Sequence, residues 1–280
     1  MVMRHNNYRL YEMNDEALQR SAPSAFAQSP ATTVSNIYRQ ITTSSVINIL
    51  RESGWYPVFA AEKRVLKENR LGFQKHMVVF KKREGAGWMQ INESLIPEII
   101  LTNSHDGCNA YQMQAGLFRL ICSNGLIVAD STFETARIRH VGFNPEMVVN
   151  ATSRVLDSVP VIAGKVEAFS KVELSPSEQR ALGLSALVAK HDPTPEEAAN
   201  LNPDAVLRPR RSEDRKNDLW TTLNVIQENV LKGRTREVIG KHRAKEVRSI
   251  DKNISLNKAL WTLAEKMNEI KSAQAAGLVA

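Results

Sequence analysis

Strand-like and helix-like patterns occupy different parts of this 280-residue chain. Between Trp55 and Ala129 the apolar residues form short alternating or continuous runs, rich in Val, Ile and Phe, with glycine turns between them. After Pro145 the apolar residues recur every three or four positions instead. This division predicts an α+β fold, with a mainly antiparallel sheet and packed helices in the first half and a helical second half.

Composition along the chain divides it into three expected parts. Residues 1–40 are rich in Ser, Ala, Thr, Asn and Gln, which is typical of a flexible polar arm that contacts a neighbouring subunit. Residues 41–145 form the expected α+β core. Residues 146–280 form the expected helical region, with a basic connector near 202–217.

Turn and capping residues set the expected elements. Ser175 with Glu178, and Thr194 with Glu197, have the spacing of helix capping boxes. Pro160 is expected to break or kink a helix over 148–159. The other helices are expected at 14–19, 45–54, 115–123, 218–233 and 256–270, and the strands at 55–66, 73–83, 96–104, 111–113, 126–129 and 135–141.

The positive charge is concentrated in two segments. The chain has 37 Lys and Arg against 30 Asp and Glu, a net charge of +7. Residues 61–83 hold eight basic and two acidic residues, and residues 208–248 hold twelve and six, so each segment carries +6. Residues 145–200, between them, carry −3. Localised charge of this kind suits a polyanion, although exposed strands and helices also collect Lys and Arg for solubility.

Motifs for catalysis and cofactors are missing from the sequence. It has no GxxxxGK[ST] phosphate loop, no HExxH and no CxxC, and its six histidines are scattered. We therefore expect no catalytic residues, no bound metal and no cofactor. No signal peptide and no apolar run long enough for a bilayer is present, so we expect a cytoplasmic protein with no membrane partner, whose Cys108 and Cys122 are reduced.

The tetrapeptide at 104–107, Ser-His-Asp-Gly, has two interpretations. In the first, it is a tight turn in which Asp106 bonds its own backbone and Gly107 takes a positive φ. Alternatively, His105 and Asp106 resemble the metal-binding pair of HD-type phosphohydrolases, although that pair lies on a helix and needs further ligands.

Several aromatic and basic residues have both a structural and a functional interpretation. Arg119 projects either toward a ligand or toward water. Trp55 and Tyr56, next to the basic segment, either stack on nucleic-acid bases or pack in the core. Trp220 and Trp261 lie on apolar helical faces and are expected in the core or at a subunit contact.

A resemblance covers the chain from about Tyr38 onward. The stretches LTNSHDGCNAYQMQAGLFRLICSNGLIV, NDLWTTLNVIQENVLKG and ISLNKALWTLAE resemble the plasmid- and phage-borne family of domain of unknown function 932, also called YafZ/YfjQ/YubP-like proteins. The mobile-element context of that family implies a role with incoming single-stranded DNA. By analogy, this context also implies a similarity to single-strand annealing proteins. The residues themselves do not carry that similarity.

These observations lead to one principal functional hypothesis. The protein binds single-stranded DNA as a homo-oligomer and pairs complementary strands without ATP, alone or with an exonuclease or a single-strand-binding protein. Annealing requires a basic groove for phosphates and no catalytic group. The residues expected to line this groove are Lys63, Arg64, Lys81, Lys82, Arg83, Arg119, Arg137, Arg139, Arg208, Arg210, Arg211 and Arg215.

Two alternatives belong to other classes. One is a protein-interaction module directed at host defence or regulation, which needs no localised positive charge. The other is a metal-dependent nuclease that uses His105, Asp106 and Asp130.

Overall fold

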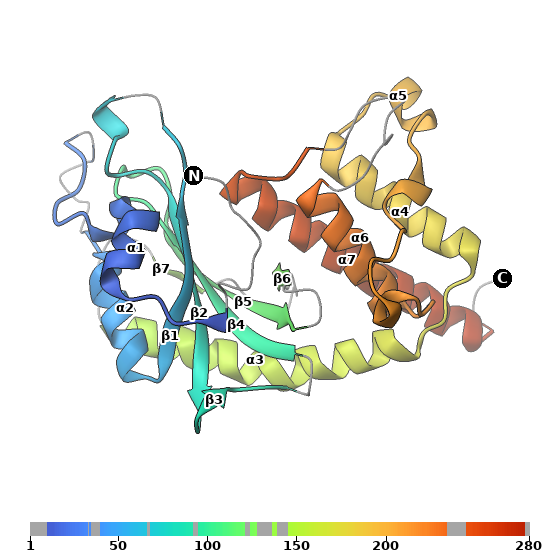
Figure 1. The fold of residues 1–280 in the computed structure, drawn as a ribbon, viewed down its shortest axis with the longest axis horizontal. Coiled ribbons are helices and arrows are strands. Elements are labelled where there is room, and N and C mark those ends of the chain that lie inside the picture. Colours follow the sequence, from blue (N-terminus) through green and yellow to red (C-terminus); the bar gives the residue numbers. More distant parts are fainter. Residues whose placement is uncertain are drawn as a thin grey trace. The chain divides into compact units, whose positions relative to one another are not determined.

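The computed structural model describes residues 10–32, 34, 40–65, 68–91, 95–120, 124–127, 136–138, 145–233 and 245–277. The described residues up to Pro160 form one compact unit, and those from Val161 onward form a second. The sheet lies in the first unit, and most helices lie in the second (Figure 1). The predicted α+β class is therefore confirmed, while the units divide at Pro160 rather than at residue 145.

The sheet is antiparallel throughout and follows the path β1-β2-β4-β5-β6. Two short strands lie off this path, because β3 pairs with β2 and β7 pairs with β5. The bounds are β1 Trp55–Glu62, β2 His76–Glu84, β3 Gly87–Trp88, β4 Leu95–Asn103, β5 Tyr111–Arg119, β6 Asn124–Ile127 and β7 Ala136–Ile138.

The strand registers give the sheet two chemically different faces. Lys81 of β2 lies opposite Glu98 of β4, so both side chains project from the same face. The neighbouring positions Phe80 and Ile99 are also paired and project from the other face. That second face lies near α2 (Thr43–Glu52), as Thr43 contacts His76 of β2. The buried Val46, Ile47 and Leu50 of α2 belong to the core of this unit.

The segment expected to be a flexible arm contains ordered elements. Helix α1 (Asp15–Ser21) begins at the N-cap Asn14, and the 3-10 helix η2 (Pro23–Phe26) follows it. Leu18, Ala22 and Ala25 are at most 1% exposed. The small and apolar side chains of this stretch thus pack into the first unit, which corrects the expectation of a mobile arm for residues 10–32.

Strand β1 is an edge strand with an irregular register. Its pairing with β2 shifts between Pro57 and Phe59, as in a β-bulge. On its outer side, the Met13 amide donates to the carbonyl of Pro57 at 2.7 Å. Proline supplies no backbone N–H, so its place on an edge strand costs no ladder hydrogen bond.

Residues 115–119 were expected to begin a helix and are part of strand β5 instead. Leu117 pairs with Pro97 of β4 on one side and with Leu126 of β6 on the other. Backbone pairing with both neighbours outweighs the local helical pattern, because each paired strand satisfies a row of N–H and C=O groups. Cys122, which was assigned to the same helix, lies outside the described residues.

Helix α3 (Pro145–Lys171) runs through Pro160 without ending, so of the break or kink expected there the break is wrong. Proline cannot donate to the i−4 carbonyl and costs a helix interior about 3 kcal/mol. The buried Val155, Val159 and Ile162 lie on the turns around it. The burial of these side chains offsets the lost hydrogen bond.

The second unit is organised around α6. Its elements are the part of α3 from Val161 onward, α4 (Pro176–His191), α5 (Pro195–Ala199), η4 (Pro203–Ala205), η5 (Ser212–Asp214), α6 (Leu219–Lys232) and α7 (Ile250–Ala275). The capping boxes at Ser175 and Thr194 are confirmed at the starts of α4 and α5. Every residue from Leu219 to Leu231 is buried, which is typical of a central helix.

Trp220 and Trp261 are core residues, as predicted. Trp220 is 7% exposed, and Trp261 is fully buried against Phe169, with their ring centroids 5.4 Å apart. Near the other end of α6, the ammonium of Lys190 donates to the carbonyl of Val230 at 2.6 Å. A cation at this position complements the negative end of the helix dipole.

Candidate nucleic-acid interface

The connection between β1 and β2 carries exposed cations. Lys63, Arg64 and Arg70 are exposed, and Lys75 is half-buried. The Lys63 amide donates to the Lys75 carbonyl at 2.7 Å, which closes the base of this connection. Sequence reasoning selected Lys63 and Arg64 from this group and left out Arg70, although all of them belong to the same basic segment.

Gln74 holds this connection in shape. Its side-chain amide donates to Glu62 at 2.7 Å, and its side-chain oxygen accepts from the Gly72 amide at 2.7 Å. Gly72 has a φ of +88°, a conformation that favours glycine. Glu62 also accepts from the Ser24 amide, so these contacts anchor the described residues at the base of the connection.

Lys81 is not a surface cation, so its assignment to the groove is wrong. Its side chain is fully buried, with its ammonium 3.7 Å from the carboxylate of Glu98 and 3.3 Å from the centroid of the Phe118 ring. Successive side chains of a strand point to opposite faces of the sheet, so the next residue, Lys82, projects from the other face and is half-buried. A buried lysine of this kind is held by its carboxylate and cannot reach a phosphate.

Arg83 lies at the exposed end of β2 among aromatic rings. Its guanidinium carbon is 4.1 Å from the centroid of the Trp88 ring and 5.8 Å from that of Tyr56. It also lies 3.5 Å from the carboxylate of Glu12. Tyr56 is half-buried, whereas Trp55 is fully buried and belongs to the core. Sequence reasoning missed Trp88, whose signal was its place directly after the turn that follows Lys82 and Arg83.

Of the three arginines predicted in the middle segment, only Arg119 has a side chain that the structure describes. Arg119 is 7% exposed on β5, so its expected projection toward a ligand is corrected to a buried position. Arg137 lies on β7, and its side chain is not among those that the structure describes. Arg139 lies outside the described residues.

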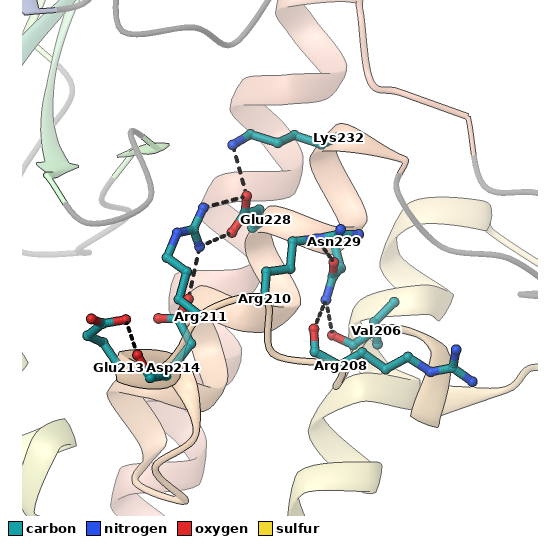
Figure 2. Close-up of polar contacts among 10 residues, drawn as sticks. Val206, Arg208, Arg210, Arg211, Glu213, Asp214, Glu228, Asn229 and Lys232 are labelled. Atoms are coloured by element: carbon teal, nitrogen blue, oxygen red, sulfur yellow. Dashed lines mark hydrogen bonds and ion pairs between the residues drawn. The ribbon is translucent and has the colours of Figure 1, made fainter.

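The basic connector of the second unit is largely engaged with α6, as Figure 2 shows. Arg211 donates to both carboxylate oxygens of Glu228, at 2.8 and 3.1 Å, and to Asp214 at 2.9 Å. Arg210 donates to the side-chain oxygen of Asn229 at 3.1 Å. Asn229 in turn donates to the carbonyls of Val206 and Arg208.

Glu228 is the electrostatic centre of this cluster. Burial alone would raise the pKa of its carboxyl. The hydrogen bond from Arg211, and the charge and hydrogen bond of Lys232, outweigh burial and lower that pKa from 4.5 to about 2. Arg210 and Arg211 therefore hold the connector against α6. Among the described side chains of the four predicted connector residues, those of Arg208 and Arg215 are exposed and make no hydrogen bond to α6.

Of the predicted groove residues with described side chains, Lys63, Arg64 and Arg83 are exposed and Lys82 is half-buried on the β1–β2 hairpin, while Arg208 and Arg215 are exposed in the second unit. Lys63 and Arg64 lie at one end of the hairpin, and Lys82 and Arg83 lie at the other. The seven residues of β2 from His76 to Lys82 separate these ends by roughly 20–25 Å at about 3.3 Å per residue. An extended strand of a few nucleotides spans such a distance.

The Ser104–Gly107 block is a turn, as the first of its two interpretations predicted. The Asp106 carboxylate accepts from Ser104 at 2.7 Å and from the Cys108 amide at 3.0 Å. Gly107 has a φ of +73°. A Cβ at Gly107 would lie 3.2 Å from Val34, so a side chain is also disfavoured by space.

His105 and His76 form a buried pair beneath this turn. Their ring centroids are 5.3 Å apart, and both residues are fully buried. Nδ1 of His76 lies 3.1 Å from the Gln74 carbonyl, so Nδ1 carries the proton. Its Nε2 then accepts from the Thr43 hydroxyl at 2.7 Å, and that hydroxyl accepts from Asn103 at 3.1 Å.

This pair predicts a loss of stability in mild acid. Burial, and then the neighbouring His105, lower the pKa of His76 from 6.5 to about 3. The unfolded chain therefore binds a proton below pH 6.5 that the folded chain resists, and stability falls by up to about 1.4 kcal/mol per pH unit as the pH drops toward 3. Urea titrations from pH 6.5 to 5 measure this slope. His76→Gln should flatten the slope, and an equal slope in both proteins contradicts the assignment.

A metal-dependent nuclease gains no support from these positions. His105 is buried, Asp106 is engaged in the turn, and Asp130 lies outside the described residues. Among the residues with described positions, no three His, Cys, Asp or Glu side chains are grouped so as to hold a metal ion.

The helices in the described part of the chain were also compared with the length and hydropathy of a membrane span. None of them is long and apolar enough to cross a membrane.

Comparison with known proteins defines the class. The family model described as Domain of unknown function (DUF932) matches residues 30–261. The chain therefore belongs to this family, which confirms the resemblance seen in the sequence. The UPF0380 proteins YafZ and YfjQ of Escherichia coli (strain K12) are 38% and 37% identical to it over 259 residues, covering 90% of this chain and 90% of each relative. No solved structure matches the chain.

Proposed function

We propose that this protein binds single-stranded DNA through the outer ends of its β1–β2 hairpin and promotes the pairing of complementary strands. The observation that carries the proposal is the set of exposed cations at Lys63, Arg64 and Arg70, on a connection whose base Gln74 ties to Glu62 and Gly72. Phosphates bind such cations with release of counterions, and this binding requires no catalytic group. Arg83 adds an exposed cation at the other end of the hairpin, where Lys82 is half-buried and projects from the opposite face.

Removing two of these cations should reduce the salt dependence of DNA binding. The variant Lys63→Gln with Arg64→Gln loses two phosphate contacts, so the slope of log affinity against log salt should fall by about 1.4 on single strands. Fluorescence anisotropy of a labelled oligonucleotide across a salt series measures this slope. The control, Lys171→Gln with Lys266→Gln, removes the same charge from side chains that are 72% and 65% exposed on α3 and α7. Equal slopes for the two variants contradict the assignment of the hairpin.

Annealing and assembly are tested in the same samples. Complementary oligonucleotides that carry a donor and an acceptor dye report pairing, and light scattering reports growth of a homo-oligomer. We expect faster pairing without ATP. Binding without faster pairing would support a role as a single-strand-binding protein and contradict the annealing activity. No binding of the unmodified protein at low salt would remove nucleic acid altogether and direct the search to a protein target.

A further inference from the structure

The end of the β1–β2 hairpin brings two aromatic rings and an arginine to one face of the sheet. Arg83 of β2 pairs directly with Trp88 of β3, and Tyr56 of β1 pairs with Lys81, two residues before Arg83. Side chains two residues apart on a strand share a face. Tyr56, Arg83 and Trp88, which we call the stacking cluster, therefore project from the same side of the sheet.

The stacking cluster is held in place by polar contacts. The Trp88 indole nitrogen donates to the Leu10 carbonyl at 2.9 Å, which fixes the plane of the ring. The Arg83 guanidinium lies 4.1 Å from the centre of that ring and 3.5 Å from the Glu12 carboxylate. A ligand that stacks on Trp88 and Arg83 meets side chains that these contacts already orient, so binding costs less conformational entropy.

The same sheet contains a second cation–π pair that is buried and purely structural. The stacking cluster differs from it because its side chains are accessible to solvent. The ammonium of Lys81 lies over the Phe118 ring, and both side chains are fully buried. Arg83 is 39% exposed, and the Tyr56 and Trp88 rings are half-buried. The other three tryptophans of the chain are at most 7% exposed. Trp88 is thus the tryptophan that a ligand in solution can reach.

The chemistry of the stacking cluster selects the kind of ligand. Its guanidinium lies against the rings and disfavours the ammonium groups that aromatic cages bind, although the Glu12 carboxylate 3.5 Å away offsets part of this charge. Planar π-faces next to a guanidinium suit an unpaired nucleobase, which stacks on the rings while the guanidinium donates to its phosphate. Duplex bases are already stacked on each other and do not offer a free face.

We propose that Tyr56, Arg83 and Trp88 form a stacking site for an unpaired base of single-stranded DNA. This inference rests on the proposed function and adds to it a contact that recognises bases rather than phosphates. It therefore predicts a difference between a normal oligonucleotide and one of the same length and charge whose nucleotides are abasic.

The test compares both oligonucleotides on one set of variants by anisotropy. Trp88→Ala should weaken binding of the normal oligonucleotide roughly 5- to 150-fold, the range for one lost stacking contact, and leave binding of the abasic oligonucleotide unchanged. Trp88→Phe keeps a ring and should retain most of the affinity. Arg83→Lys keeps the charge but loses the planar group, so it should weaken the normal oligonucleotide more than the abasic one.

Tryptophan emission gives an independent readout. Titration with the normal oligonucleotide should quench the emission of the unmodified protein, and the Trp88→Phe variant should lose this quenching. Equal weakening of both oligonucleotides by Trp88→Ala, or no weakening of either, would overturn the stacking site while leaving phosphate binding intact. Failure of the unmodified protein to bind either oligonucleotide would overturn the proposed function together with the site.

Discussion

Replacing Lys81 with methionine should lower the free energy of unfolding by about 3–5 kcal/mol. Methionine keeps much of the apolar length of the side chain but removes the ammonium that lies 3.7 Å from the Glu98 carboxylate. Glu98 is 1% exposed, so its charge then remains in a site that water does not reach. Urea unfolding of the variant and of the unmodified protein measures the change.

A double variant separates the charge effect from packing. Lys81→Met combined with Glu98→Leu removes both charges, and it should recover most of the lost stability, because apolar replacement of a whole buried pair is often close to neutral. A loss below about 1 kcal/mol in the single variant would contradict the description of Lys81 as a buried partner of Glu98. The neighbouring Lys82→Gln is the matched control, since Lys82 projects from the other face and is half-buried. That variant should unfold like the unmodified protein.

Replacing Glu228 with glutamine should cost about 3 kcal/mol at neutral pH. The carboxyl has a pKa near 2 against an ordinary value of 4.5, and each unit of this difference corresponds to about 1.4 kcal/mol. Because the folded pKa is the lower one, the stabilisation is complete above pH 4.5 and is lost as the pH falls toward 2. Glutamine cannot keep both charge-assisted bonds from Arg211.

The pH profile distinguishes this charge effect from a packing defect. Between pH 4.5 and 2 the unmodified protein should lose stability more steeply than Glu228→Gln, since the variant has no carboxyl to protonate there. Glu213→Gln is the control on the same connector, because Glu213 is exposed and bonds only Ser212 among the cluster residues in Figure 2. Parallel pH profiles for Glu228→Gln and the unmodified protein would show that the carboxyl of Glu228 is not ionised in the folded chain.

Sequence patterns correctly predicted the helices and strands that depend only on residues close together in the chain. The capping boxes at Ser175 and Thr194 require only residues three positions apart, and both are present. The β1 and β2 strands followed from their alternating apolar residues. The helix expected over 115–123 was wrong because β4 and β6 decide the conformation of residues 115–119, and their pairing is not visible in a window of ten residues.

The candidate site was harder to predict for the same reason. A count of charges cannot distinguish Lys81 from Lys82, because the partner of Lys81 is Glu98 on the next strand of the sheet path. Likewise, Arg211 faces Glu228, seventeen residues further along the chain. Both partners are brought near by tertiary packing, so sequence reasoning placed buried and exposed cations in one groove.

The outer side of β1 has a consequence for how copies of this chain meet. An edge strand usually offers a row of unpaired amides on which another sheet can grow. Here Pro57 lacks an N–H, the register is broken between Pro57 and Phe59, and the carbonyl of Pro57 is already taken by the amide of Met13. Another chain would have to displace residue 13 and match an interrupted ladder. Self-association by strand addition at β1 is therefore disfavoured, so the homo-oligomer that we propose would have to form through other surfaces.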